Sequence, residues 1–309
     1  MTIVVAGATG LAGSAIVRAF EKAGKEVVGI NRSVVDLLDL PATKKFLKDV
    51  APSMVIDAAA RVGGIGANNA FPVEFLTDNI RIQSNLMDAA HEANVERFIF
   101  LGSSCIYPRD CAQPIKEEYL MTGPLEPTND AYSLAKISGY YMCKKYTEQY
   151  GFKTVSVMPN NLYGINDNFI LSECHVIPSL INKFVHAKEK NESQVMCFGD
   201  GSPTREFLFS DDLASGCLFL MNNYDSPEII NIGPNREVSI KDLSELIAEL
   251  VGYDGEIVWD TSKPNGTPRR ALDTSKMDSM GWKSTTSLEH GLKMTIDWFM
   301  ENRNTYVRI

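Results

Sequence analysis

Several patterns that define other classes of protein are scarce in this chain. It has only 6 cysteines among 309 residues, with no CxxC pair and no dense disulfide framework. We therefore expect free thiols and a cytoplasmic location. The 4 histidines form no motif with metal-ligand spacing, so we expect no bound metal.

Long hydrophobic runs and excess positive charge are also missing. No apolar run approaches the roughly 18 residues that would span a bilayer, and the first apolar run leads straight into a glycine-rich turn, unlike a signal peptide. The formal net charge is -9, whereas a nucleic-acid binder needs a basic surface. We expect neither membrane nor nucleic acid as a partner, although a local cluster of arginines can still bind a small anion.

The first half of the chain alternates short apolar runs with longer helical patterns. We expect strands near residues 3–6, 26–30, 54–58, 98–101 and 154–158, with helices near 11–23, 43–49, 71–93 and 132–150. This alternation predicts parallel βαβ units. The predicted fold class is therefore α/β, with a Rossmann-type, doubly wound parallel sheet that binds ligands at the carboxyl ends of its strands.

The pattern changes beyond residue 160, where segments are less regular and richer in proline, glycine and asparagine. We expect a smaller α+β substrate-binding lobe that is interleaved with the Rossmann domain. The predicted Rossmann domain covers 1–165 with a returning segment at about 206–233. The predicted lobe covers 166–205 and 234–309, including helices near 241–251 and 288–300.

A glycine-rich turn follows the first predicted strand, in the sequence VVAGATGLAGSAI. Gly7, Gly10 and Gly13 would allow a tight turn, close approach of a pyrophosphate and close packing of the helix. The following helix would present free N–H groups and the positive end of its dipole to the pyrophosphate. This turn predicts a dinucleotide cofactor.

The residues after the second predicted strand indicate which dinucleotide is bound. An NAD-selective site usually has an acid there for the ribose hydroxyls, whereas this chain has Arg32, which suits the 2′-phosphate of NADP(H). Asp39 and Leu40 follow where an adenine would lie. The small residues 58–60 at the end of the third strand leave room for the cofactor.

A tyrosine and a lysine lie four residues apart in NDAYSLAKISGYY. Tyr132 and Lys136 would share one face of a helix. The ammonium of the lysine would lower the pKa of the phenol and make it an acid–base group. Ser103, after the fourth strand, would hydrogen-bond a substrate carbonyl at the same edge of the sheet.

The glycine turn, Ser103, Tyr132 and Lys136 occur in the order that is typical of the extended short-chain dehydrogenase/reductase family, which the whole chain resembles. The resemblance implies hydride transfer with the nicotinamide, Tyr132 as the acid–base group and Ser103 as the residue that polarises the substrate oxygen. It also implies that Lys136 lowers the pKa of the tyrosine and binds the nicotinamide ribose.

Further motifs resemble the GDP-L-fucose synthases within that family. They are AAARVGGIGANNAFP (58–72), LGSSCIYP (101–108), LEPTNDAYSLAKISG (125–139), MPNNLYG (158–164), DNFILSECHVIP (167–178), GDGSPTREFLFSDDLA (199–214) and KPNGTPRRALD (263–273). Enzymes of this group invert C3 and C5 of GDP-4-keto-6-deoxy-mannose and then reduce its C4 ketone with NADPH.

Inversion at carbon requires a base and an acid on opposite faces of the sugar, because the 4-keto group acidifies the protons on C3 and C5. Cys105 and His175 are the candidates, both expected at the carboxyl edge of the sheet. The residues alone leave the order of the pair open. The resemblance implies that Cys105 is the base and His175 the acid.

The resemblance also implies most of the binding residues. The expected cofactor contacts are Gly7, Thr9, Gly10, Leu11, Gly13, Arg32, Asp39, Leu40, Ala58, Ala59, Ala60, Leu101, Tyr132, Lys136, Pro159, Asn161, Leu162 and His175. The expected contacts to the GDP-sugar are Ser103, Ser104, Cys105, Asn160, Val176, Lys183, Phe198, Arg205 and Arg270.

Three positions depart from the family pattern. Lys183 stands where the family has an arginine, which removes the bidentate fork. Phe198 replaces a tryptophan beside the substrate. The turn carries Ala8 and Thr9 where relatives can place an arginine for the 2′-phosphate, so Arg32 must carry more of the preference for NADPH.

Three other functions remain open, and one oligomeric state is expected. A GDP-L-colitose synthase would invert only C5, and an NAD-dependent nucleotide-sugar 4-epimerase would consume no cofactor. A dinucleotide-sensing regulator is a third reading, but such proteins tend to lose the tyrosine or the lysine. Apolar positions such as Met87, Tyr140 and Met142 are expected on the outer faces of two helices, where relatives form a homodimer.

Overall fold

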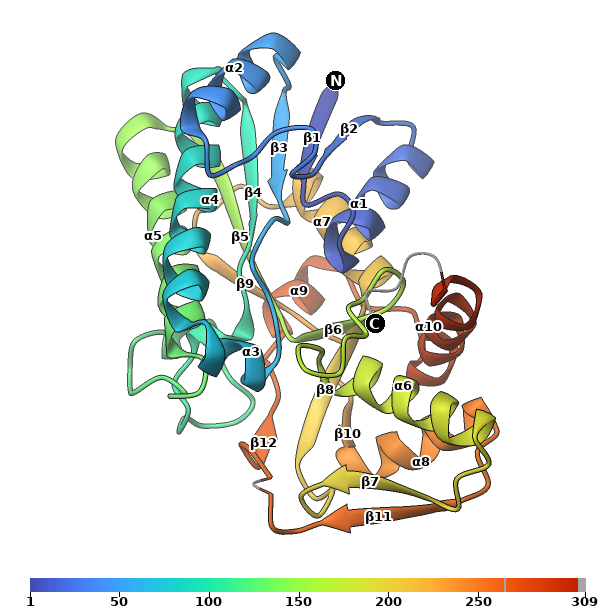
Figure 1. Ribbon diagram of the computed structural model, residues 1–309. Helices are drawn as coiled ribbons and strands as arrows, with labels where there is room; N and C mark the ends of the chain where they lie inside the picture. The colour runs from blue at the N-terminus through green and yellow to red at the C-terminus, as the bar shows by residue number, and fades with distance from the viewer. Residues whose placement is uncertain (264, 305–309) are drawn as a thin grey trace.

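The computed structural model describes residues 1–263 and 265–304. Pro264, which lies inside one of the motifs above, is therefore outside the described residues. The core is a six-stranded parallel sheet (Figure 1). In spatial order its strands are β2 (Glu26–Ile30), β1 (Thr2–Ala6), β3 (Met54–Asp57), β4 (Arg97–Leu101), β5 (Lys153–Pro159) and β9 (Ile229–Ile232).

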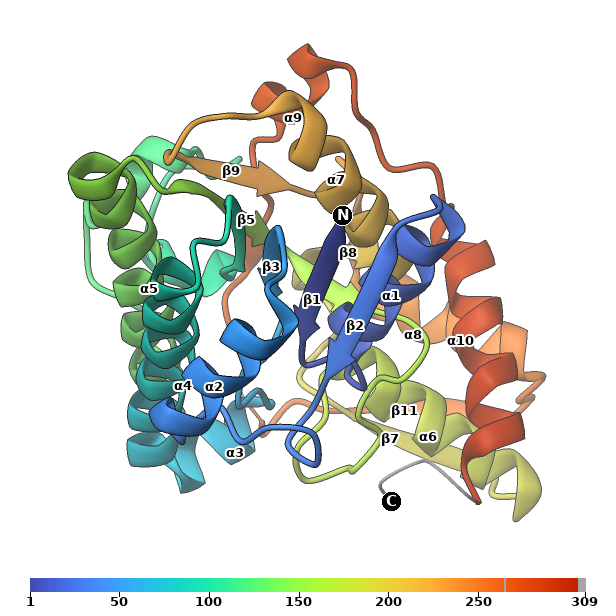
Figure 2. The same cartoon turned by 90° about the horizontal axis from the view of Figure 1, so that it is seen from above.

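Helices cover both faces of this sheet, as Figure 2 shows from above. They are α1 (Leu11–Lys22), α2 (Leu40–Val50), α4 (Pro72–Glu92), α5 (Asp130–Tyr150), α7 (Ser210–Asn223) and α9 (Ser275–Met280). The short helix α3 (Ile65–Ala70) lies beyond the strand ends, beside the start of α4. Alternate strand residues point to opposite faces. Val4 and Val55 therefore pack with α2, α4 and α5, whereas Ile3 and Ile56 pack with α1 and α7.

A smaller lobe lies beyond the carboxyl edge of the sheet (Figure 1). Its strands are β6 (Asn161–Tyr163), β8 (Thr204–Phe209), β10 (Glu237–Ser239) and β12 (Arg269–Arg270), together with the pair β7 (Gln194–Phe198) and β11 (Glu256–Asp260). The helices α6 (Val176–Glu189), α8 (Ile240–Val251) and α10 (Leu288–Asn302) share its separate hydrophobic core. Short 3-10 turns at η1 (Ser104–Ile106) and η2 (Glu117–Tyr119) complete the described elements.

The two parts are joined through buried polar contacts rather than by a flexible linker. Strand β6 follows β5 directly and pairs in parallel with β8. Asn160, between β5 and β6, donates to the buried Glu206 of β8 at 3.0 Å. The same oxygen, Glu206 Oε2, also accepts a hydrogen bond from the backbone N–H of Leu272 at 2.9 Å. The smaller lobe is therefore anchored on the carboxyl edge of the large sheet.

The α/β fold class is confirmed. The first five strands have the order 2-1-3-4-5, one of the common doubly wound orders, and β9 extends the sheet beside β5. The one or two helices expected near 71–93 are the single helix α4, and the short helix α3 before it was not expected. Pro72 cannot continue α3 and begins α4 instead. The proposed domain boundaries remain a proposal. Strands β6 and β8, which lie near those boundaries, pair with each other.

Two apolar residues expected on outer helix faces are buried. Met87 is 2% exposed and packs under α4 against the sheet, and Tyr140 is 4% exposed and packs beside Met158. Both helices lie directly on the sheet, so these positions face inward. Among the described residues, no helix is both long and apolar enough to cross a membrane.

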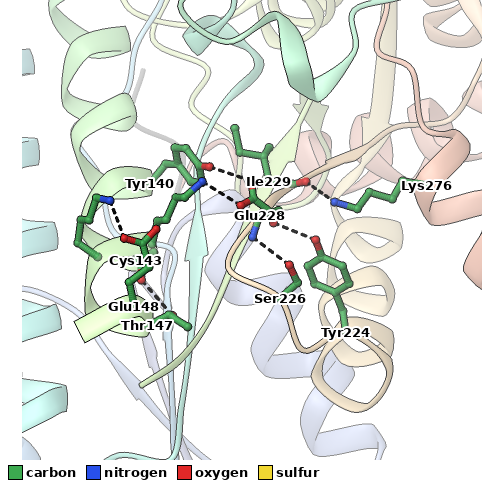
Figure 3. Close-up of polar contacts among 11 residues, drawn as sticks. Tyr140, Cys143, Thr147, Glu148, Tyr224, Ser226, Glu228, Ile229 and Lys276 are labelled. Carbon is green, nitrogen blue, oxygen red and sulfur yellow. Dashed lines mark hydrogen bonds and ion pairs between the residues drawn. The ribbon is translucent and has the colours of Figure 1, made fainter. Parts of the chain in front are cut away.

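A polar cluster around Glu228 fastens α5 to the start of the edge strand β9 (Figure 3). The Glu228 carboxylate accepts from Lys144 at 2.9 Å and from Tyr140 at 3.3 Å, both on α5. Its carbonyl accepts from Tyr224 at 3.0 Å, and the adjacent Ile229 carbonyl accepts from Lys276 at 2.9 Å. The helix that carries the YxxxK pair is thus tied near its middle to the start of β9.

The packing of α5 on the sheet predicts the effect of one substitution. A Cβ at Gly139 would lie 2.3 Å from Phe100 Cζ and 2.8 Å from Gln83 Oε1. We expect Gly139→Ala to destabilise the protein by about 1–3 kcal/mol, the usual cost of overpacking a core. Gln149→Ala, on the exposed side of the same helix, is the control and should be nearly neutral. Urea unfolding measures both, and equal stability of the two variants would contradict this packing.

Candidate functional site

The glycine turn after β1 is built by close contacts between backbone segments. A Cβ on Gly13 would lie 2.1 Å from the carbonyl oxygen of Gly7, and a Cβ on Gly7 would lie 2.6 Å from the carbonyl oxygen of Ala58. Gly7 also has φ +74°, which a side chain disfavours. Gly10 caps α1 in an extended conformation without a side-chain capping bond. The free N–H groups of the helix therefore face the carboxyl edge of the sheet.

The residues expected to select the cofactor lie beside this turn. Arg32 is exposed just after β2. Asp39 is the N-cap of α2, and its Oδ1 accepts from the Ala42 N–H at 3.0 Å. Leu40 begins that helix. The helix cap thus already engages one oxygen of the Asp39 carboxylate.

The third strand ends in small residues that keep this edge open. The residues 58–60 are partly exposed, and Ala59 donates its N–H to Asp57 Oδ1 at 3.1 Å. The following segment is held by Asn79, whose amide accepts from the Arg61 N–H at 2.7 Å and donates to the Arg61 carbonyl at 3.0 Å. The chain after β3 is therefore held in place from α4.

Ser103 and Cys105 lie together after β4, at the carboxyl edge where both were expected. Ser103 caps the short turn η1, and its Oγ accepts from the Cys105 N–H at 3.2 Å. Both residues are partly exposed, whereas Ser104 between them is buried. The amide of Asn129, at the start of α5, donates to the Cys105 sulfur at 3.4 Å. The thiol is thus partly accessible and oriented by a hydrogen bond.

Tyr132 lies beside this pair. Its ring packs edge-on against Phe75 with centroids 6.3 Å apart. Burial raises the pKa of the Tyr132 phenol and the nearby Cys105 thiol raises it further, while a hydrogen bond with Ser103 lowers it. The net direction is upward, so the expected lowering of this pKa is wrong for the residue in this structure. The reason is desolvation of the buried phenol, which outweighs the lowering of its pKa by the Ser103 hydrogen bond.

Lys136 lies one helical turn further along α5 and is buried. Its ammonium donates to the Leu101 carbonyl at 2.8 Å and lies 5.9 Å from the centre of the Tyr132 ring. Burial lowers the pKa of Lys136, and Asp57 raises it. The lysine is therefore held at the end of β4, beneath the tyrosine.

His175 comes from a loop that packs on the segment after β3. It is the N-cap of α6 and remains accessible, yet the surrounding protein lowers the pKa of its imidazole by burial. The loop before His175 lies against Gly64, which donates its N–H to the Glu173 carbonyl at 2.6 Å. A Cβ on Gly64 would lie 2.7 Å from the Cys174 carbonyl. The segment GGIG therefore positions the loop that carries His175.

Arg205 and Arg270 form a cationic pair on neighbouring strands. They are register partners on β8 and β12, and repulsion from Arg270 adds to burial in lowering the pKa of Arg205. Arg205 donates to the Thr204 carbonyl at 2.7 Å, and Arg270 donates to the Ser104 carbonyl at 2.5 Å. Arg270 thus reaches the turn that carries Ser103 and Cys105. Two partly buried guanidinium groups that repel each other favour an anionic ligand.

Lys183 and Phe198 lie together in the smaller lobe. The Lys183 ammonium is 4.7 Å from the Phe198 ring centroid and donates to the Met196 carbonyl at 3.0 Å. Phe198 is 63% exposed, a large apolar surface that a planar ligand can cover. The structure places the other expected binding residues at the ends of elements or close to them: Thr9 follows β1, Leu11 starts α1, Pro159 ends β5, Asn161 and Leu162 lie in β6, and Val176 starts α6.

Asn160 has a different position from the one expected of a substrate ligand. It is 7% exposed, and its amide nitrogen is used by Glu206 inside the protein, while its Oδ1 has no hydrogen-bond partner among the described residues. Its part in substrate binding remains a prediction.

Sequence reasoning did not identify Asn129 and Asp57 as parts of this site. Asn129 precedes Asp130 at a helix start, where asparagine is a common cap, so its type suggested no contact to a thiol. Asp57 ends a buried strand, and only the fold brings it near Lys136. The one available signal was an acid within an otherwise apolar strand.

The arrangement is suited to dinucleotide-dependent acid–base chemistry. The turn at Gly7 and Gly13 leaves a backbone cradle at a helix N-terminus, which fits the pyrophosphate of a dinucleotide. Across residues 1–263 and 265–304, no group of three or more His, Cys, Asp or Glu side chains is placed to hold a metal ion.

Comparisons with known proteins agree with this geometry. The family model of the NAD dependent epimerase/dehydratase family matches residues 3–233. A putative GDP-L-fucose synthase 2 of Arabidopsis thaliana is 48% identical over 97% of this chain and 92% of its own length. The GDP-L-fucose synthase of Escherichia coli is 43% identical over 98% of both chains. A GDP-L-colitose synthase of Yersinia pseudotuberculosis is 36% identical over 98% of this chain and 99% of its own.

A solved structure extends the likeness to the backbone. The GDP-L-fucose synthetase of Naegleria fowleri bound to NADP superposes with a TM-score of 0.93 at 33% identity, covering 100% of this chain and 95% of that one. The motifs after β1, β4 and β5 and on α5 therefore lie in a fold that is shared over the full length. The chain belongs to the NAD dependent epimerase/dehydratase family, in the branch that contains its GDP-L-fucose synthase relatives.

Proposed function

We propose that this protein converts GDP-4-keto-6-deoxy-mannose to GDP-L-fucose, by inversion at C3 and C5 followed by reduction at C4 with NADPH. The observation that carries the proposal is the convergence of Ser103, Cys105 and Tyr132 at one edge of the sheet, beside the arginine pair. Relatives named GDP-L-fucose synthase at 43–48% identity support it.

NADPH fits the edge formed by the turn after β1 and the small residues after β3. When bound, NADPH supplies the hydride for the C4 carbon. The backbone at Gly7, Gly10 and Gly13 would hold the pyrophosphate, and the exposed Arg32 would pair with the 2′-phosphate. The structure of the Naegleria fowleri relative contains NADP, which supports the same choice here.

Reduction of a ketone requires a proton at the oxygen that becomes a hydroxyl. The raised pKa of Tyr132 keeps its phenol protonated at neutral pH, so the residue begins the step as a proton donor. Ser103 hydrogen-bonds the phenol and would also donate to the C4 oxygen. Lys136 would attract the phenolate that forms and bind the nicotinamide ribose. A donor role therefore fits Tyr132 better than a resting phenolate.

The inversions require that Cys105 and His175 act from opposite faces of the sugar. The C4 oxygen would carry negative charge in the enediolate, where Ser103 and Tyr132 would stabilise it. The resemblance assigns Cys105 as base and His175 as acid. The lowered pKa favours a neutral imidazole, which must first take a proton before it can donate one. The negative charges of the diphosphate would raise this pKa and favour the donor form.

The nucleotide end of the substrate would lie along the smaller lobe. Arg205 and Arg270 would bind the diphosphate, because an anion between them relieves their mutual repulsion. The exposed ring of Phe198 would contact the guanine, with Lys183 beside it as a point charge.

One assay tests the function directly and separates the rival activities. The purified protein, NADPH and GDP-4-keto-6-deoxy-mannose should give steady loss of NADPH and a product that NMR identifies as GDP-L-fucose. No net NADPH loss would point to a 4-epimerase. Turnover only of the 3-deoxy substrate, with inversion at C5 alone, would point to a colitose synthase like the relative at 36% identity.

We further infer a cytoplasmic homodimer. All six cysteines are free, as expected in a reducing compartment. Helices α4 and α5 pack together and leave Val73, Leu134 and Tyr141 exposed at 65%, 49% and 39%. These residues, rather than Met87 and Tyr140, would form the apolar contact. Light scattering coupled to gel filtration should give twice the chain mass of 34.2 kDa, whereas a monomer at micromolar concentration would contradict the dimer.

Two glycine substitutions test the proposed pyrophosphate cradle. Gly13→Ala should lower both the melting temperature and the affinity for NADPH, because its Cβ would overlap the Gly7 carbonyl. Gly10→Ala should fold normally, because its Cβ meets only that carbonyl oxygen, at 3.4 Å. We expect it to weaken NADPH binding about tenfold or more by keeping the pyrophosphate from the backbone. Wild-type affinity in both variants, measured by NADPH fluorescence, would refute the cradle.

Substitution of Cys105 separates the two reactions. Cys105→Ser should abolish exchange of the substrate C3 and C5 protons with deuterated water, since a hydroxyl is a far weaker base than a thiolate. NADPH affinity should not change. Cys111→Ser is the matched control, because Cys111 is a partly buried thiol whose sulfur donates to the Pro108 carbonyl at 3.4 Å. Exchange at the normal rate in Cys105→Ser would show that the thiol is not the base.

A further inference from the structure

Asp57 is a buried carboxyl that the proposed mechanism does not use. It is 0% exposed, at the carboxyl end of β3, between its register partners Ala6 on β1 and Phe100 on β4. Its Oδ1 accepts from the Ala59 N–H at 3.1 Å, and its Oδ2 has no hydrogen-bond partner among the residues that the structure describes. An ionised carboxylate in such a place requires a compensating charge nearby.

Lys136 is the cation that faces this carboxyl. It is 3% exposed, and its Nζ lies 4.8 Å from the ring centroid of Phe100, the register partner of Asp57. The Leu101 carbonyl accepts one hydrogen bond from this ammonium, so its positive charge is only partly compensated by the backbone. Each group favours the charged form of the other, since Asp57 raises the pKa of Lys136 and Lys136 lowers that of Asp57.

The other groups around Lys136 carry no charge at neutral pH. On α5 itself, Tyr132 stays protonated, and burial raises the pKa of Cys143 to about 12. From α4, the Gln83 amide donates to the Ala135 carbonyl at 2.6 Å, and from β5 the Ser156 hydroxyl faces Cys143. From η1, Cys105 acts on Tyr132 and not on Lys136. Asp57 is thus the carboxylate that acts on Lys136 within the described part of the chain.

We propose that Asp57 is a positioning residue for the reduction, whose buried carboxylate keeps Lys136 an ammonium beneath Tyr132 and so extends activity to higher pH. The proposal rests on the proposed function, in which Lys136 attracts the phenolate and binds the nicotinamide ribose. Asp57 would act on the reaction through Lys136, and its charge also raises the pKa of Tyr132, which helps to keep the phenol a proton donor. Its charge at neutral pH follows from a pKa raised to about 6, because burial outweighs the attraction of Lys136.

Titration of Asp57 makes a contribution to the free energy of unfolding that falls as the pH rises. The folded pKa of about 6 lies above the ordinary value of 3.8. Folding is therefore favoured by this group below about pH 4, and that contribution is lost as the pH rises through about 6. An asparagine at this position should leave the melting temperature at pH 8 unchanged or higher. If Asp57 only supported the fold, its replacement by asparagine would lower the melting temperature at pH 8.

The test compares pH profiles of Asp57→Asn and Asp57→Leu with the wild type. Asparagine keeps an oxygen for the Ala59 amide, and leucine replaces the carboxyl by an apolar group of similar size if asparagine fails to fold. Without the carboxylate, the alkaline fall of kcat should begin about one pH unit lower, the usual effect of one nearby opposite charge. The KM for the sugar should not change. Ser156→Ala, which alters an uncharged buried group in the same cluster, should follow the wild type.

A second readout does not depend on the sugar. NADPH affinity, measured by fluorescence from about pH 6.5 to 9.5, should weaken at lower pH in Asp57→Asn than in the wild type, because the ribose contact loses its ammonium. If the wild type fails to turn over the sugar, the proposed function fails while this comparison still decides the role of Asp57. Profiles of both readouts that coincide with the wild type, or that shift equally in Ser156→Ala, would overturn the proposal.

Discussion

The close approach of three backbone segments at Gly7 is the constraint on which the rest of the site depends. The carbonyl of Gly7 leaves no room for a side chain at Gly13, and the carbonyl of Ala58 leaves none at Gly7. The first turn of α1 is thereby placed against the ends of β1 and β3. A parallel sheet then brings the segments after β4 and β5 to the same edge, where the serine, the thiol and the tyrosine meet.

Desolvation decides the charge states at this edge. It raises the pKa of Tyr132 and of Asp57, and it lowers those of Lys136, His175 and Arg205. The phenol therefore rests as a donor, and the paired arginines favour an anion even though the net charge of the chain is -9. Within our proposal, two reactions share one set of oxygens, since the groups that stabilise an enediolate also polarise the ketone for reduction.

The sequence predicted those features that depend on local patterns. The strand Glu26–Ile30 was expected with the same bounds, and the glycine turn has the tight geometry that its spacing indicated. Ser103 and Cys105 were both expected at the carboxyl edge of the sheet, where they lie together. The α/β class and the parallel, doubly wound sheet followed from the βαβ rhythm, whereas the spatial order of the strands came from the structure.

Features that arise from contacts distant in the chain were not predictable in this way. The register of β8 with β12 pairs Arg205 with Arg270, and Asp57 meets Lys136 only because β3 lies beside β4. The direction of the Tyr132 pKa shift was wrong because the burial of a phenol depends on the whole fold. Met87 was assigned to the wrong face because the polar residues Asn79 and Gln83 share the buried face of α4, so apolar side chains alone do not mark the side that meets the sheet.

The central claim is that one site carries both carbon inversion and ketone reduction, and an isotope experiment tests it most directly. The protein is incubated in deuterated water with GDP-4-keto-6-deoxy-mannose and unlabelled NADPH, and the product is examined by NMR. Our account predicts a GDP-6-deoxy-L-hexose with deuterium at C3 and C5 and protium at C4, since the hydride comes from the cofactor. A reduced product without solvent deuterium at either C3 or C5 would contradict it.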